Sequence, residues 1–143
     1  MLRDTATAQE NHERFVRRAI ASESVWGVRN DSGFQSCQSN EDESRRVLLF
    51  WSDAAYARRA VSIDYRDCEP AEIDLFDFLF RWLRGMADDN VLVGTNYTGD
   101  LCGLELEPME LQEQLVDAMP KEMLGRYRDR LARELEEQRA RKG

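Results

Sequence analysis

The residues best suited to catalysis are few in this chain: one histidine, His12, and three cysteines, Cys37, Cys68 and Cys102. An enzyme of the Cys–His type would have to bring His12 beside one of these thiols, a proximity that the sequence neither shows nor forbids. His12 lies at helical spacing from Phe15, so we expect it on the flank of a helix, exposed to solvent. Cys102 adjoins an expected strand, which favours a buried, inert thiol. No catalytic residues are therefore predicted.

The same residue types also argue against a metal or cofactor site. The cysteines stand 31 and 34 residues apart, so we expect free thiols in a reducing compartment and no zinc site. The acidic triplet 41–43 lacks the regular ligand spacing of a calcium loop, and a solvated loop is expected there. Residues 94–99 begin and end with glycine like a phosphate loop, but Asp100 follows and would repel a phosphate. We expect no cofactor.

Aromatic and polar residues stand where two expected strands end, and they form the candidate site. They are Trp51, Ser52, Tyr56, Thr95, Asn96 and Tyr97. A strand end beside a free helix N-terminus is a common place for a ligand to bind, and Trp and Tyr anchor many protein interfaces. The alternative is that Phe50 and Trp51 are core residues. The two groups form one site only if they lie at the same end of the sheet.

A strongly apolar helix must organise the core behind these residues. Residues 74–84 place seven large apolar side chains among eleven positions. The polar residues Asp74, Asp77 and Arg81 follow a 3.6-residue period as one narrow stripe, so the rest of the circumference is apolar. Leu79 and Leu83 should therefore be buried.

Periodicity and turn signals predict the remaining elements. We expect helices at residues 8–22, 53–60, 74–87, 108–119 and beyond 120, and strands at 25–29, 34–38, 47–51, 61–65, 91–93 and 102–106. The first two strands should form a hairpin, and the unbroken apolar run 47–51 indicates a strand covered on both faces. Ser52 and Asp74 are expected helix N-caps. This order predicts a single-domain α+β fold, with an antiparallel or mixed sheet covered by helices and a charged C-terminal helix.

The C-terminal segment differs in character from the rest. We expect an α+β domain over residues 1–120 and a charged helical extension over residues 121–143. The extension has one thin apolar seam that should dock on the domain, formed by Leu124, Tyr127, Leu131 and Leu135. A seam of barely one and a half heptads is too short to dimerise well, so we expect a monomer or a weak homodimer.

Charge distribution favours some partners over others. Residues 1–120 carry 12 basic and 23 acidic side chains, whereas residues 121–143 carry 8 basic and 5 acidic ones. An acidic domain repels nucleic acid, so we expect no nucleic-acid partner and, if any, a basic protein partner. No apolar run suggests a signal peptide or membrane span, so we expect a cytoplasmic protein without membrane contact.

Several short motifs together resemble the DUF2750 family of bacterial proteins, whose function is not established. They are Val25-Trp26, Leu49-Phe50-Trp51-Ser52, Tyr56-Ala57, Phe78-Leu79, Trp82-Leu83, Val93-Gly94-Thr95-Asn96 and Gly103-Leu104-Glu105-Leu106-Glu107-Pro108. The resemblance spans roughly residues 15–117 and leaves out the tail after Pro120. The family pattern often has Trp where this chain has Tyr65 and Tyr97. The resemblance implies no catalytic residues.

Two functions follow as hypotheses. The first is a small non-enzymatic protein that binds another protein, as an immunity or adaptor protein does. The alternative is a small-molecule binder or enzyme with its pocket near Trp51, Ser52, Tyr56, Thr95 and Asn96. A deep pocket lined by these residues would favour the alternative, and a flat or filled surface would remove its basis.

Overall fold

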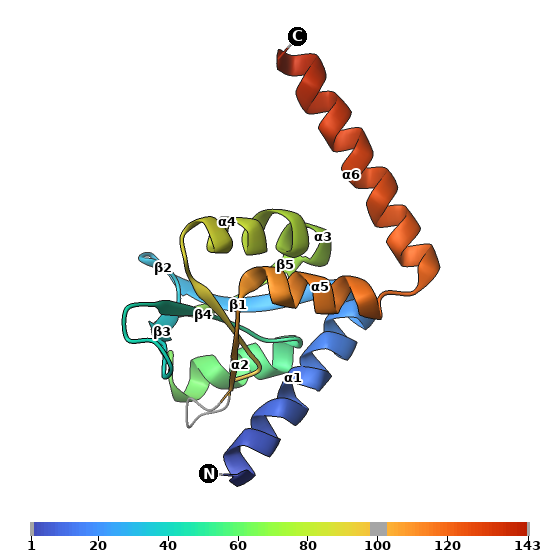
Figure 1. Ribbon diagram of the computed structural model, residues 1–143. Helices are drawn as coiled ribbons and strands as arrows, with labels where there is room; N and C mark the ends of the chain where they lie inside the picture. Colours follow the sequence, from blue (N-terminus) through green and yellow to red (C-terminus); the bar gives the residue numbers. More distant parts are fainter. Residues whose placement is uncertain (1, 98–102, 143) are drawn as a thin grey trace.

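The computed structural model describes residues 2–97 and 103–142 and has the α+β architecture expected from the sequence (Figure 1). The helices are α1 (Leu2–Ser22), α2 (Ala54–Ile63), α3 (Leu75–Asp77), the π-helix η1 (Phe78–Trp82), α4 (Leu83–Asp88), α5 (Pro108–Ala118) and α6 (Lys121–Lys142). The strands are β1 (Ser24–Asn30), β2 (Gly33–Phe34), β3 (Ser36–Gln38), β4 (Arg46–Phe50), β5 (Glu69–Asp74), β6 (Leu92–Thr95) and β7 (Leu104–Leu106). Within these ranges, no helix has the length and apolar character needed to cross a membrane.

The strands form two small sheets that meet at a pair of tryptophans. The first has the order β2-β1-β5 and is antiparallel, and the second has the order β3-β4-β6-β7. In the second sheet β4 and β6 run parallel, while the outer pairs are antiparallel. Trp26 and Trp51 join the sheets, because each backbone N–H donates to the other's carbonyl at 2.7 Å.

Strand β4 separates two hydrophobic clusters, as its unbroken apolar sequence predicted. Phe50 belongs to the larger cluster under α1, α3, α4 and α5, against which Leu48 also packs. Val47 and Leu49 belong to the smaller cluster, which α2 covers. Alternate side chains of a strand point to opposite faces, so a strand covered on both sides must be apolar throughout.

The central apolar segment is helical, and its buried face is the predicted one. Leu79 and Leu83 are completely buried, and the Asp74 carboxylate caps the segment by accepting the backbone N–H of Asp77 at 3.4 Å. The turn Phe78–Trp82 is a π-helix, a local widening that side-chain periodicity does not reveal. Phe78 and Trp82 both make edge contacts with Phe50 on β4, at centroid distances of 4.9 and 6.0 Å.

The predicted hairpin partner at residues 34–38 is divided between the two sheets. Only Gly33–Phe34 pairs with β1, and Ser36–Gln38 pairs with β4. Gln35 lies at the crossing point: its N–H donates to Val28 of β1 at 2.9 Å, and its carbonyl accepts from Leu49 of β4 at 3.4 Å. The turn signal was correct, but tertiary pairing ended the hairpin after two residues.

The predicted strand at residues 61–65 is wrong. Helix α2 continues to Ile63, and the next strand, β5, starts only at Glu69. Continuing the helix keeps Val61 packed against the smaller cluster, in which Ala57 and Ala60 are already buried. The N-cap position is Asp53, without a side-chain cap, rather than the predicted Ser52.

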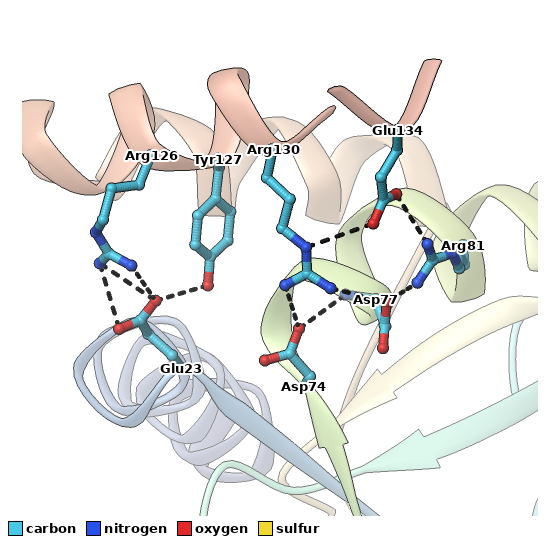
Figure 2. Close-up of polar contacts among 8 residues, drawn as sticks. All are labelled: Glu23, Asp74, Asp77, Arg81, Arg126, Tyr127, Arg130 and Glu134. Atoms are coloured by element: carbon cyan, nitrogen blue, oxygen red, sulfur yellow. Dashed lines mark hydrogen bonds and ion pairs between the residues drawn. The ribbon is translucent and has the colours of Figure 1, made fainter. Parts of the chain in front are cut away.

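Helix α6 docks on the body through a patch that we call the α6 clamp. It comprises Phe76 and the residues drawn in Figure 2, which are Glu23, Asp74, Asp77, Arg81, Arg126, Tyr127, Arg130 and Glu134. Tyr127 is buried against Phe76, and its hydroxyl donates to Glu23 at 2.9 Å. Burial, with Glu23 beside the hydroxyl, raises the pKa of Tyr127 above its usual range. The seam ends at Leu135, which is 46% exposed, and α6 then projects away from the body (Figure 1).

Candidate ligand-binding site

The parallel pairing of β4 and β6 brings the two predicted groups of site residues together. Phe50 and Thr95 are partners in the ladder, so the residues that follow them emerge at the same edge of the sheet. A crevice at the carboxyl ends of parallel strands is a common place for ligand binding. The sequence did not establish this pairing, and the structure supplies it.

Asn96 ties this edge of the sheet to the neighbouring segments. Its backbone has a positive φ of 49°, a conformation that asparagine tolerates better than most residues. Its side-chain Oδ1 accepts the backbone N–H of Ser52 at 2.9 Å, and Nδ2 donates to the Asn11 carbonyl of α1 at 3.1 Å. One buried amide therefore fixes the ends of β4 and β6 against α1.

The aromatic residues at this edge are held equally firmly. The indole N–H of Trp51 donates to the Tyr97 carbonyl at 2.9 Å, and the Trp51 ring makes an edge contact with Tyr65. A Cβ added at Gly94 would lie only 2.7 Å from the Tyr97 ring, so glycine is needed for the ring to pack this closely against β6. The Tyr56 hydroxyl accepts a hydrogen bond from Arg18 at 3.0 Å.

These side chains border a cavity of about 270 Å³ between α1, α2 and the ends of β4 and β6, which we call the aromatic pocket. It is lined by Asn11, Arg14, Trp51, Tyr56, Arg59, Ala60, Ile63, Asp64, Tyr65, Asn96 and Tyr97. Burial raises the pKa of Tyr65 to about 12, so its hydroxyl stays protonated at neutral pH. The lining combines stacking surface, hydrogen-bonding groups and charge in one place.

Four of the six predicted site residues line the pocket: Trp51, Tyr56, Asn96 and Tyr97. Ser52 and Thr95 are buried beside it instead. The Ser52 hydroxyl donates to Asp53, while Thr95 faces the larger cluster on the other side of β6. Their contribution is to hold the lining residues in position.

His12 is buried, and the prediction of a solvated histidine is wrong. Its ring is 3% exposed, with Nδ1 2.8 Å from the Thr95 hydroxyl and Nε2 2.6 Å from Oε1 of Gln114. Because an amide oxygen only accepts, Nε2–H is the donor to Gln114, and in the neutral ring Nδ1 accepts from Thr95. His12 thus links α1, β6 and α5 and holds β6 from behind the pocket.

The lining residues contributed by α1 and the second half of α2 were not predicted from the sequence. Ile63 was placed in an expected strand because α2 was expected to end at residue 60, and nothing near Arg59 and Ala60 in the sequence indicated that they face a cavity. Extending the helix by one turn would have placed Ile63 on the same face as Tyr56, seven residues earlier. Asn11 and Arg14 carry no such signal, since a contact between α1 and the end of β6 depends on the tertiary fold.

The cysteines lie apart from this chemistry where they are described. Cys37 and Cys68 are free thiols, and Cys102 lies outside the described residues. Burial, with the adjacent Asp67, raises the pKa of Cys68 to about 11 and so disfavours its thiolate. Across the described ranges, no group of three or more His, Cys, Asp or Glu side chains is placed to hold a metal ion.

Comparison with models of protein families identifies a match. The model of a family described as a protein of unknown function, DUF2750, matches residues 12–115. That segment contains His12 and every lining residue of the pocket except Asn11, while α6 lies wholly outside it. A search of curated proteins found no match.

Proposed function

The chain belongs to the DUF2750 family, whose description assigns no function, and from its geometry we propose that it binds a small molecule in the aromatic pocket. The observation that supports this most directly is convergence. Residues from α1, from α2 and from the ends of two parallel strands meet around one cavity. Its volume is near the lower end of the range for ligand sites, about 300 Å³ and upward, which suits a compact ligand.

The hydrogen bonds around the pocket favour binding because they prepare its walls in advance. Trp51 is anchored to Tyr97, and Asn96 is anchored to Ser52 and Asn11. A ligand entering a site of this kind orders few additional side chains, so less of its interaction energy is lost to conformational entropy.

The lining chemistry suits recognition of a ligand. Four aromatic rings supply stacking surface, and Asn11, Arg14, Arg59 and Asp64 supply polar contacts. The one histidine, by contrast, has both ring nitrogens engaged behind β6. Binding is therefore the function that these groups support best.

A pair of alanines on α2 provides a matched test. Ala60 lines the pocket, whereas Ala55 is exposed on the same helix and does not. Compact aromatic fragments, charged and neutral, would be titrated into ¹⁵N-labelled protein while the indole signal of Trp51 is followed by NMR. We expect binding to the native protein and to Ala55→Phe, and its loss in Ala60→Phe with the fold retained in circular dichroism. Absence of any fragment binding, or unchanged binding by Ala60→Phe, would overturn the proposal.

A protein partner is the second candidate, and the projecting end of α6 supports it (Figure 1). A helix that continues beyond its last apolar contact presents surface that the body does not use. Affinity purification from the native host would compare the whole chain with one ending at Leu135. A specific partner lost on truncation supports this function, and the same partners recovered by both proteins would show that α6 is not the binding surface.

A further inference from the structure

Arg14 differs from the other partly buried arginines. Three described arginines are neither buried nor fully exposed: Arg14, Arg45 and Arg130. Arg45 pairs with Glu107, and Arg130 pairs with Asp74, Asp77 and Glu134. Within the described residues Arg14 has no carboxylate partner, and its side-chain contact is a hydrogen bond to Asn11 Oδ1 at 3.5 Å.

A guanidinium in this position without a carboxylate partner among the described residues carries an energetic cost. Removing an arginine partly from water weakens its hydration, and a paired carboxylate normally compensates for this loss. The protein is rich in such carboxylates, with 28 acidic against 20 basic side chains. Arg14 nevertheless faces a cavity that an anion could enter.

The charge around the pocket has the same sign as Arg14. Among the described residues, the lining contains two arginines, Arg14 and Arg59, and one carboxylate, Asp64. A second, broader hollow on the opposite face of α1 is lined by three glutamates and Arg17. The two hollows therefore attract opposite charges, although the protein as a whole is acidic.

We infer that the aromatic pocket takes a small organic anion with a flat, unsaturated body, such as an aromatic carboxylate or phosphate; this inference rests on the proposed function. The anionic group lies at Arg14, whose planar guanidinium can donate two parallel hydrogen bonds, and Arg59 adds charge at the rim. The flat body lies among Trp51, Tyr65 and Tyr97. A compact cavity of about 270 Å³ limits the body to one or two fused rings.

Charged and neutral ligands of equal shape test this directly. Benzoate and indole-3-carboxylate would be compared with benzamide and indole-3-carboxamide by titration of the Trp51 indole signal. We expect the anions to bind about tenfold more tightly at low salt, and this preference to shrink in about 1 M salt. Phenyl phosphate is a further ligand: if it binds more tightly than benzoate, the inference holds and the anionic group is a phosphate.

Matched variants locate the charge that is responsible. Arg14→Gln should remove the preference for the anion, while Arg17→Gln, on the same helix but facing the other hollow, should keep it. Arg59→Gln, which changes a lining residue, and Arg58→Gln, which changes its neighbour outside the lining, form a second matched pair. This pair still tests the role of positive charge if Arg14→Gln does not fold. Equal binding of carboxylates and amides, unchanged by Arg14→Gln, would overturn the inference of an anion and leave the pocket as a neutral-ligand site. Failure of every ligand would instead overturn the proposed function.

Discussion

The α6 clamp and the aromatic pocket use the same type of residue in opposite ways. In the clamp, the Arg130 guanidinium pairs with Asp74, Asp77 and Glu134 (Figure 2). It also lies 4.0 Å from the centre of the Phe76 ring. In the pocket, Arg14 lies beside aromatic rings but has no carboxylate among the described residues. Both side chains are partly buried, so the difference between them is one of pairing.

This contrast separates a structural arginine from one available for binding. A charge whose partners belong to the same chain contributes to the folded state and has little left to offer a ligand. A charge without such partners lowers stability slightly and keeps its hydrogen bonds for another molecule, a trade-off common at functional sites. Substitutions in each region separate the two roles, and a substitution in the larger cluster gives the scale of stability loss against which they are compared.

The largest loss of stability should come from Leu79→Ala. Leu79 is completely buried in the larger cluster, to which Tyr127 of α6 also belongs, and removing it opens a cavity there. We expect the free energy of unfolding to fall by about 2–5 kcal/mol in urea denaturation. Asp77→Ala is the control on the same segment and should cost less than about 1 kcal/mol, because its ion pairs are solvent-exposed. Similar losses from both variants would show that the orientation of the helix is wrong.

Removing α6 should break the clamp and leave the pocket intact. A chain ending at Pro120 loses the burial of Met123 and Tyr127, which we estimate at about 2–4 kcal/mol after the cost of ordering the helix. The melting temperature should fall by roughly 5–15 °C. A chain ending at Leu135 is the control and should melt at nearly the native temperature, because Leu135 is already 46% exposed. Unfolding or loss of an oligomer in this shorter truncation would make the end of α6 an assembly element.

Alkaline pH should weaken the pocket side of the molecule through Cys68. The thiol's pKa is raised from about 9 to about 11 in the folded protein, so folding gains stability below pH 9 and loses it as the pH rises through 11. The free energy of unfolding should therefore decline between about pH 9 and pH 11. Cys68→Ala should flatten this decline, whereas Cys37→Ala, at a more exposed thiol, should change it less. If the free energy of unfolding declines equally with pH in the native protein and in Cys68→Ala, Cys68 is not the group responsible for the decline.

The smallest expected changes in the free energy of unfolding are those of Arg130→Gln and Arg14→Gln, which compare the two arginines directly. Arg130→Gln removes three ion pairs and the contact with Phe76, and we expect a loss of about 0.5–1 kcal/mol that decreases in high salt. Arg14→Gln should change stability by less than about 0.5 kcal/mol, or increase it, because it breaks no ion pair with a described residue. Urea denaturation at low and high salt measures both, and a larger loss for Arg14→Gln would assign it a structural role.

Local patterns were enough to predict much of the fold. The narrow polar stripe correctly placed Leu79 and Leu83 in the core, the apolar run identified β4, and Asp74 was recognised as an N-cap. Each of these signals depends on neighbouring residues alone. The failures depend on distant residues. Residues 61–65 alternate like a strand, but residues 61–63 continue a helix that packs on the first sheet. Gln35 changes sheets because it meets both β1 and β4.

The candidate site was predictable only in part, for the same reason. Trp51, Tyr56, Asn96 and Tyr97 were found because aromatic and polar residues at strand ends are a local signal. Arg14 could not be found, since nothing near it in the sequence indicates that it faces a cavity. His12 was assigned to solvent because its two partners lie 83 and 102 residues further along the chain.

The parallel pairing of β4 with β6 also bears on folding kinetics. Val47 must find Leu92, and His12 must find Gln114, 102 residues away, so forming this part of the molecule closes very long loops. Contacts of such high sequence separation slow folding, because chain entropy is lost before they can stabilise the structure. The pocket should therefore be absent until late in folding. A ligand that requires the finished pocket would slow unfolding and leave the refolding rate unchanged.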